Sequence, residues 1–155
     1  MRKDKLLILC TQNSARSQMA EAFFEKYGGD ILEAYSAGLE PTAVNPYAVR
    51  VMQEVGINLS GKRSKSFREF LGRMQFGYVI GVCKKVEKQC PSIFPGGRNC
   101  LSWPFEDPAA YEGTDEEKLA KFREVRDQID EKVRMWVDDF RHGRVDCQLC
   151  RERKE

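Results

Sequence analysis

The chain has 155 residues, the length of one ordinary domain with enough chain to bury most of its apolar surface. Hydrophobic residues make up 41% and charged residues 32% of it, which excludes a disordered tail and a membrane span. With 26 basic and 24 acidic side chains the net charge is +2, which argues against a general nucleic-acid binder with its basic face.

The first part of the chain predicts a strand, a loop, a helix and a second strand. Residues 5–10 form a short apolar run, typical of a strand buried on both faces. Residues 11–15 are small and polar and form a loop. Ser17 then opens a helix that ends at Gly28 and the glycine after it. Residues 31–36 are expected to form the second strand.

Two shorter helical segments follow. Asn45 precedes a proline, which predicts the capped start of a helix that ends near Val55. Ser66 and Glu69 predict a capping box for a short helix that runs through Leu71.

The rest of the chain predicts two strands and a long helix. Residues 78–82 form a third buried strand, and residues 99–103 form a weaker fourth. A capping box at Thr114 and Glu117 begins the last helix, which Gly143 ends. Because strands alternate with helices, the fold class is α/β with a parallel sheet. The apolar stripe of the last helix, expected to pack on the sheet, comprises Leu119, Phe122, Val125, Ile129, Val133, Trp136 and Phe140.

No repeat or linker divides the chain, so we expect one domain over residues 1–143 and a charged tail over residues 144–155. The single histidine, His142, excludes mechanisms that need two, such as a two-histidine zinc site. No export signal is visible, so the six cysteines are expected to be reduced thiols in a cytoplasm. A functional cysteine is then expected to act chemically rather than structurally.

The loop after the first strand is suited to binding a tetrahedral oxyanion. Amides of a tight loop at a helix start can turn inward around an anion, and Arg16 adds a two-pronged donor. The same positive field predicts a lowered pKa and a thiolate for Cys10, with a hydrogen bond from Ser17 to the sulfur. Asn13 tolerates the left-handed backbone of a tight loop. The alternative is a buried cysteine beside a surface arginine. The predicted oxyanion-binding residues are Thr11, Gln12, Asn13, Ser14, Ala15 and Arg16.

The motif C-T-Q-N-S-A-R-S-Q-M-A-E, which starts at Cys10, resembles the signature of the low-molecular-weight protein tyrosine phosphatase superfamily. Within it, the motif is most similar to the thioredoxin-coupled arsenate reductases, and the resemblance extends from Lys5 to about Val137. It implies a phosphatase-like catalytic domain with a four-stranded parallel sheet of order 2-1-3-4, flanked by helices. Many arsenate reductases carry a second cysteine where this chain has Ala15, but the family chemistry does not need that thiol.

The segment around Asp107 resembles the Asp-Pro segment of the same family. The resemblance implies that the carboxyl group of Asp107 protonates the departing oxygen of the bound oxyanion. Taken without the resemblance, a turn-forming Asp-Pro pair is the alternative.

Two further cysteines distinguish arsenate reduction from phosphate ester hydrolysis. Arsenic accepts electrons from sulfur and phosphorus does not, so reduction requires a second thiol that attacks Cys10. Cys83 follows the third strand, and sites of parallel sheets lie at the carboxyl ends of the strands, so it is expected beside Cys10. The segment from Cys83 to Cys90 resembles the redox segment of the arsenate reductases at the same spacing. The alternative is two thiols that do not communicate.

The spacing of Cys83 and Cys90 limits how they can pair. In a helix their Cα atoms would lie ~10.5 Å apart, whereas a disulfide needs roughly 7 Å or less. Such a helix must therefore unfold before the bond forms. Three lysines and a single apolar anchor, Val86, predict that this unfolding costs little free energy.

The resemblance implies reduction of arsenate to arsenite, as in arsenical resistance. Cys10 would form an adduct with arsenate, and a disulfide cascade over Cys10, Cys83 and Cys90 would follow. A thioredoxin-type dithiol would reduce the enzyme again, with glutaredoxin or mycothiol as alternative donors. We expect a cytoplasmic monomer that uses no metal or organic cofactor and binds no nucleic acid or membrane. The alternative functions are a low-molecular-weight tyrosine phosphatase and a non-enzymatic thiol switch.

Some arsenate reductases of this group hold a potassium ion behind the loop, and three of the matching positions here are Asn13, Glu21 and Ser36. Lys65 stands where the family has an aspartate, and its ammonium group would repel a cation. We expect Lys65 to supply the positive charge itself by pairing with Glu21. The alternative is a solvated lysine.

The remaining cysteines have weaker claims to a role. Cys147 and Cys150 lie beyond the family match. They can relay electrons, form half of a zinc site that another chain completes, or merely oxidise in a frayed tail. Cys100 is expected to be a core thiol of the fourth strand.

Overall fold

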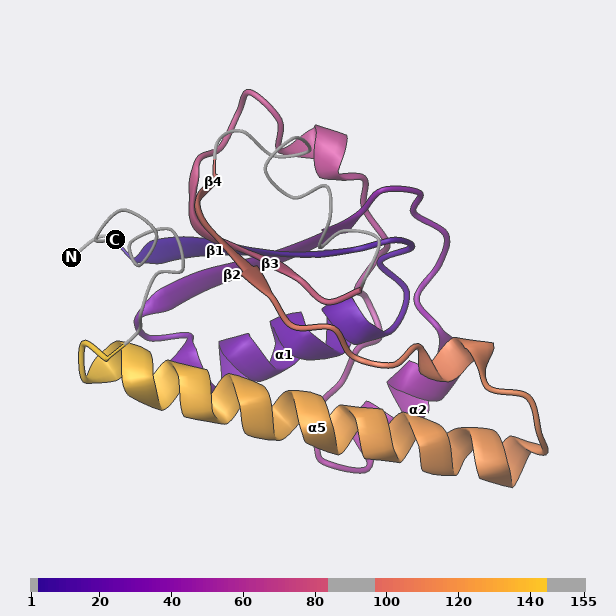
Figure 1. Ribbon diagram of the computed structural model, residues 1–155. Helices are drawn as coiled ribbons and strands as arrows, with labels where there is room; N and C mark the ends of the chain where they lie inside the picture. The colour runs from indigo at the N-terminus through magenta and orange to yellow at the C-terminus, as the bar shows by residue number, and fades with distance from the viewer. Residues whose placement is uncertain (1–2, 84–96, 145–155) are drawn as a thin grey trace.

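The computed structural model describes residues 3–83 and 97–144 (Figure 1). Its strands are β1 (Asp4–Cys10), β2 (Leu32–Gly38), β3 (Phe76–Gly81) and β4 (Gly97–Ser102). Its helices are α1 (Arg16–Gly28), α2 (Pro46–Gln53) and α5 (Asp115–Arg141), with short 3₁₀ turns η1 (Phe67–Glu69) and η2 (Pro108–Ala110). Among these described residues, no helix is both long and apolar enough to cross a membrane.

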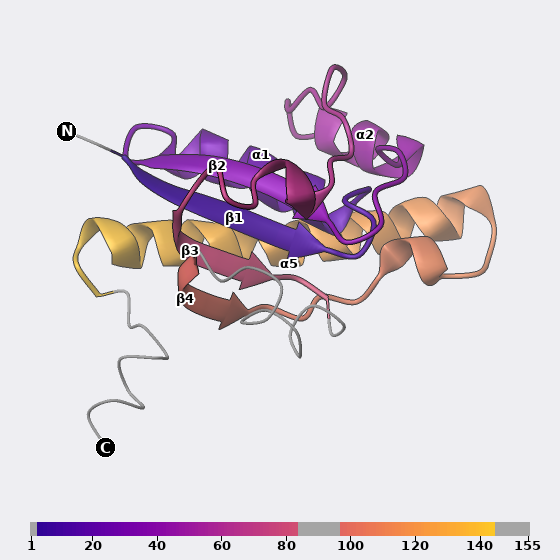
Figure 2. The same ribbon diagram turned by 90° about the horizontal axis from the view of Figure 1, so that it is seen from above.

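The four strands form one parallel sheet in the order β2-β1-β3-β4 (Figure 2). This confirms the predicted class and the order that the family resemblance implies. Cys10, the last residue of β1, pairs with Gly38 of β2, and Leu9 pairs with Gly81 of β3. The carboxyl ends of three strands therefore meet at one edge of the sheet.

Strand β1 lies in the middle of the sheet, and its last five residues are buried. Both faces of a central parallel strand are covered, which is why an uninterrupted apolar run forms it. Helices α1 and α5 lie side by side on one face of the sheet (Figures 1 and 2), and α2 packs against α5. The Trp136 ring of α5 also lies edge-on to Tyr78 of β3, with 5.1 Å between centroids. The apolar stripe of α5 thus faces the sheet and the two other helices.

Two helix caps form where the sequence predicts them. Asn45 Oδ1 accepts a hydrogen bond from Tyr47 N at 2.8 Å at the start of α2, which ends at Gln53, slightly earlier than predicted. Thr114 Oγ1 accepts from Glu117 N at 3.2 Å at the start of α5. Each cap satisfies a backbone donor that the helix leaves without a partner.

The predicted capping box forms at Ser66, but it begins only one turn. Ser66 Oγ accepts from Arg68 N at 3.2 Å, and the Glu69 carboxylate accepts from the backbone N–H of Ser66 while it also pairs with Arg63 Nη2 at 2.7 Å. A single 3₁₀ turn replaces the helix expected to run through Leu71.

Candidate active site

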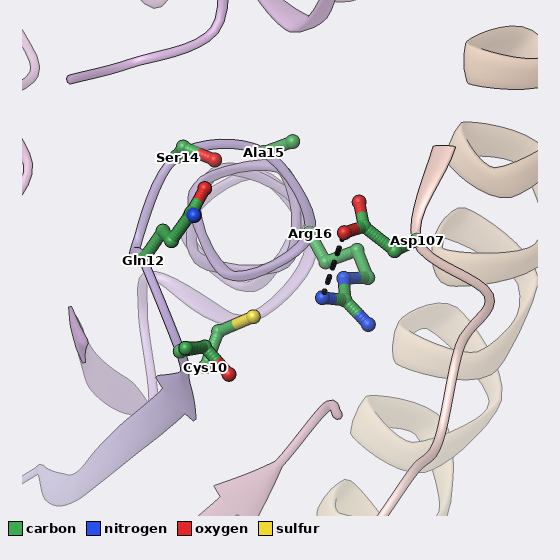
Figure 3. A pocket seen from close by; sticks show the side chains of 7 residues that line it. Cys10, Gln12, Ser14, Ala15, Arg16 and Asp107 are labelled. Carbon is green, nitrogen blue, oxygen red and sulfur yellow. Dashed lines mark ion pairs between the residues drawn. The ribbon is translucent and has the colours of Figure 1, made fainter. Parts of the chain in front are cut away.

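A cavity of about 160 Å³ opens at the carboxyl end of β1. In Figure 3, Cys10 lies at its base, and Gln12 lies on the opposite side from Arg16 and Asp107. Every residue predicted to bind an oxyanion lines the cavity except Asn13, which is buried behind it. The lining residues are Cys10, Thr11, Gln12, Ser14, Ala15, Arg16 and Asp107.

The backbone carbonyls of the loop point away from the cavity because residues 39–45, which we call the outer brace, bind them. The pairs, from donor N–H to acceptor carbonyl, are Leu39 to Cys10 (3.1 Å), Glu40 to Thr11 (2.8 Å), Thr42 to Gln12 (3.2 Å) and Asn45 to Ser14 (2.8 Å). Within the described residues, no carbonyl accepts from the N–H groups of residues 12–15. These donors remain available to an anion in the cavity.

Asn13 holds the loop in its tight turn. Its φ of 52° confirms the left-handed backbone anticipated at this position. Asn13 Oδ1 accepts from Lys65 N at 2.9 Å and from Gln18 Nε2 at 3.0 Å, and the Asn13 carbonyl accepts from Ser64 Oγ at 2.7 Å. Asn13 Nδ2 donates to Ser17 Oγ at 2.8 Å. In the described part of the chain Ser17 makes no hydrogen bond to the Cys10 sulfur, so this predicted contact is not seen.

Gly38 allows β2 to lie directly against the loop. A Cβ atom at this position would lie 2.8 Å from Thr11 O, 2.9 Å from Asn13 N and 2.9 Å from Gln12 C. All three are backbone atoms, which cannot rotate away as a side chain can. The sequence analysis missed this role and that of the outer brace. For Gly38, the only indication in the sequence was its place at the end of a strand next to the strand that carries Cys10.

Arg16 and Asp107 meet at one wall of the cavity. Arg16 Nη1 donates to the Phe105 carbonyl at 2.9 Å, and Arg16 Nη2 lies 3.7 Å from Asp107 Oδ2 (Figure 3). The other oxygen, Asp107 Oδ1, accepts from Ala109 N at 3.0 Å and caps η2. Asp107 therefore begins a turn and also presents a partly exposed carboxyl group to the cavity.

Cys83 lies beside Cys10. Both are buried, Thr11 Oγ1 lies 3.3 Å from Cys83 Sγ, and the two thiols share a hydrogen bond. That hydrogen bond and burial raise the pKa of Cys10, while the Arg16 charge and the Thr11 N–H act in the opposite direction. The net direction is upward, so the predicted lowering of this pKa is wrong. The prediction counted the positive groups of the loop and omitted burial and the neighbouring thiol.

Glu21 is a buried carboxyl group behind the loop, and Glu21 Oε2 accepts from Ser36 Oγ at 2.9 Å. Burial raises the pKa of Glu21, while the charges of Lys65 and Lys62 lower it. Lys65 Nζ donates to the Arg63 carbonyl at 3.2 Å. Lys65 therefore acts on Glu21 through space rather than in the direct pair that was expected.

These residues do not fit a bound potassium ion. Asn13 Oδ1 already accepts two hydrogen bonds, and Lys65 brings a positive charge to the same region. Gln18 Oε1 is a buried acceptor with no hydrogen-bond donor in the described residues, but one neutral oxygen does not make a cation site.

Three cysteines of the sequence analysis, Cys90, Cys147 and Cys150, lie outside the described residues. Cys100 on β4 is half-buried and packs at the margin of the core. Cys10 and Cys83 are thus the two thiols that the described structure brings together, and of the two Cys10 lines the cavity.

Comparisons with known proteins show which families and structures this chain is similar to. The family model described as low molecular weight phosphotyrosine protein phosphatase matches residues 5–146. An arsenate reductase of Halalkalibacterium halodurans is 42% identical over 139 residues, which cover 89% of this chain and 98% of the relative. One of Bacillus subtilis is 39% identical over 134 residues, which cover 86% and 94%. A solved arsenate reductase in the phosphate-binding state matches with a TM-score of 0.74 and 33% identity, covering 88% of this chain and 98% of that one.

Proposed function

This chain belongs to the low molecular weight phosphotyrosine protein phosphatase family, and we propose that it reduces arsenate to arsenite with a thioredoxin-type dithiol as electron donor. The observation that carries the proposal is Cys83, a second buried thiol hydrogen-bonded to Cys10, which itself lines the anion cavity. Ester hydrolysis needs one cysteine and a water, whereas reduction needs a second sulfur. The relatives named arsenate reductases support the same choice.

The first step joins sulfur to arsenic. Arsenate enters the cavity, where loop N–H groups and Arg16 bind its oxygens. Cys10 loses its proton to solvent and attacks arsenic, forming a sulfur–arsenic bond while one arsenic–oxygen bond breaks. Asp107 protonates the departing oxygen, which leaves as water, and takes a proton back from solvent afterwards.

The second step transfers the electrons. Cys83 passes its proton to an oxygen of the arsenic group, and its Sγ attacks Cys10 Sγ, so a disulfide forms, the sulfur–arsenic bond breaks and its electron pair stays on arsenic. Arsenic is reduced from As(V) to As(III), and each sulfur is oxidised by one electron. Cys90 then attacks Cys83 and frees Cys10, and the external dithiol reduces the resulting Cys83–Cys90 disulfide. A reducing cytoplasm is the compartment that keeps such thiols available.

The lining of the cavity also favours a small free oxyanion over an aryl ester. None of the seven described residues that line the cavity is aromatic, so among them the ring of phosphotyrosine finds no flat side chain to stack on. This described lining offers recognition for the oxyanion group alone.

The full chain, assayed with thioredoxin, thioredoxin reductase and NADPH, tests the proposal. We expect arsenate-dependent NADPH consumption, and we expect mass spectrometry after one turnover to find Cys83 and Cys90 in one trapped disulfide. Hydrolysis of p-nitrophenyl phosphate without NADPH consumption would instead assign the chain as a phosphatase. A chain with neither activity would be a thiol switch, and the proposal would be wrong.

Removing the proposed acid should slow the chemistry and spare binding. We expect Asp107→Asn to lower kcat for arsenate by about a hundredfold, the usual contribution of a general acid. Phosphate affinity should stay the same or rise, because the carboxylate beside Arg16 is also removed. The control is Glu106→Gln, which removes the adjacent carboxylate, paired with Lys121. Equal kcat in the two variants would contradict the role of Asp107.

Lys65 should make the activity independent of the monovalent cation. We expect equal rates in potassium and in sodium chloride, because Lys65 already supplies positive charge near Glu21. Lys65→Met keeps the length of the side chain without its charge, and its rate should be lower than that of the wild type in both salts. A wild-type rate that rises steeply with potassium would refute this, as would a variant that behaves like the wild type in both salts.

A further inference from the structure

Gln18 is a fully buried polar side chain of α1 that lies behind the anion loop. Its side-chain nitrogen, Nε2, donates to the Asn13 carbonyl at 3.2 Å, to Asn13 Oδ1 at 3.0 Å and to the Arg63 carbonyl at 3.0 Å. Its side-chain oxygen, Oε1, is buried and has no donor among the residues that the structure describes. A buried acceptor without a donor costs stability, so the contribution of this side chain lies with its nitrogen.

The three oxygens around Nε2 fix the orientation of the Gln18 amide. The two backbone carbonyls can only accept, and Asn13 Oδ1 already accepts from Lys65 N at 2.9 Å. If the Gln18 amide were turned over, its oxygen would face three acceptors with no proton between them. Oε1 therefore lacks a donor because Nε2 has to face the loop.

Gln18 also occupies the position from which a glutamine can cap its own helix. Ala15 is the N-cap residue of α1, and Gln18 is the third residue of that helix. In a capping box, the side-chain oxygen at this position accepts from the N–H of the N-cap residue. Here the amide reaches past Ala15 to Asn13 with its nitrogen. Within the described residues no acceptor takes the Ala15 N–H, which stays available to an anion.

Asn13 has a backbone conformation that its neighbours must hold in place. Its φ of 52° lies in the left-handed region, which is unfavourable for a residue with a Cβ atom. Ser64 Oγ donates to the Asn13 carbonyl at 2.7 Å, but Ser64 belongs to the connection between α2 and η1. Among the described residues, Gln18 is the only residue of α1 that donates to this carbonyl. Gln18 therefore fixes the backbone of the loop relative to the helix that starts at the anion cavity.

From these contacts we infer that Gln18 is a positioning residue of the anion site. It holds Asn13 in its left-handed conformation and, by turning its oxygen away from the helix start, leaves the Ala15 N–H free for the oxyanion. It does not line the cavity and acts through the loop. The inference rests on the proposed function only in that the loop binds an oxyanion, and it requires no redox step.

Phosphate binding and urea unfolding of the full chain, measured side by side, test this role. Gln18→Met keeps the length of the side chain and removes its donor. We expect calorimetry to show a dissociation constant for inorganic phosphate about tenfold higher than that of the wild type, because fewer molecules hold the loop in its binding conformation. The urea midpoint should stay near wild type, because each of the three oxygens keeps another donor and the unsatisfied oxygen is gone. These remaining donors are Ser64 Oγ, Lys65 N and Lys65 Nζ.

The control is Arg126→Met, which removes another buried donor to a backbone carbonyl, that of Val51 in α2. It should lower the urea midpoint and leave phosphate affinity unchanged, the reverse of the pattern expected for Gln18→Met. Gln18→Glu replaces Gln18→Met if that variant does not fold. A carboxylate cannot donate to Asn13 and can accept from the Ala15 N–H as in a capping box, so phosphate affinity should fall at least about tenfold.

Phosphate affinity within about twofold of the wild type in Gln18→Met would overturn the inference. An affinity loss that Arg126→Met shares would also overturn it, because both variants would then act through stability. These titrations contain neither arsenate nor reductant. A failed thioredoxin assay would therefore contradict the proposed function alone, and an unchanged phosphate affinity would contradict the role of Gln18 alone.

Discussion

Replacing Cys83 by serine is expected to lower arsenate-dependent NADPH consumption by about three orders of magnitude or more, as the loss of an essential nucleophile does. Serine keeps the size of the side chain and can still bond to Thr11 Oγ1, 3.3 Å from the sulfur of Cys83. A hydroxyl cannot form a disulfide, so no electron pair reaches arsenic. Hydrolysis of p-nitrophenyl phosphate, which needs only Cys10, should remain near the wild-type rate.

The control for this variant is Cys100→Ser, which alters a half-buried thiol of β4 that has no role in the proposed cycle and should leave turnover close to wild type. The idea fails if Cys83→Ser still reduces arsenate through thioredoxin.

A second readout is the rate at which iodoacetamide alkylates Cys10 at different pH values. The hydrogen bond that the Cys10 thiol donates to the Cys83 sulfur raises the pKa of Cys10, so Cys83→Ala should move the midpoint of that profile to lower pH. An unmoved midpoint would mean that the neighbouring thiol does not set this pKa.

Replacing Gly38 by alanine should cost about a hundredfold in kcat/KM for arsenate, although Gly38 contributes no chemical group. The added Cβ would lie within 3.0 Å of backbone atoms of Thr11, Gln12 and Asn13, so the anion loop has to shift. A misplacement approaching 1 Å at a catalytic group is enough for an effect of this size. Phosphate affinity, measured by calorimetry, should fall as well because the inward N–H groups move together.

Gly77→Ala is the matched control, because Gly77 is also a strand glycine. Within residues 3–83 and 97–144, a Cβ at Gly77 would meet only Lys5 O, at an ordinary 3.7 Å, so near-wild-type kinetics are expected. Urea unfolding of both variants separates a local shift of the loop from a general loss of stability. Wild-type phosphate affinity and kcat/KM in Gly38→Ala would show that the loop tolerates the contact.

Much of the fold and part of the site follow from local sequence patterns. The buried run of β1, the cap at Asn45 and the stripe of α5 each reflect a periodicity or a backbone requirement that a short window of sequence contains. The position of Cys83 follows the same way, because it comes directly after a parallel strand that pairs with β1. The order of the four strands came from the family resemblance rather than from any such pattern.

The sequence by itself determined which groups can do chemistry here: a cysteine at the end of a central strand, an anion loop of small residues, an arginine and a second thiol. Only the tertiary structure decided their state and their limits. It raised the pKa of Cys10, set the outer brace against the loop carbonyls and left room for no side chain at Gly38. These features depend on burial and on contacts between segments far apart in the chain. Burial and long-range contacts arise only when the strands pair and the helices pack on the sheet, so no local pattern of residues encodes them.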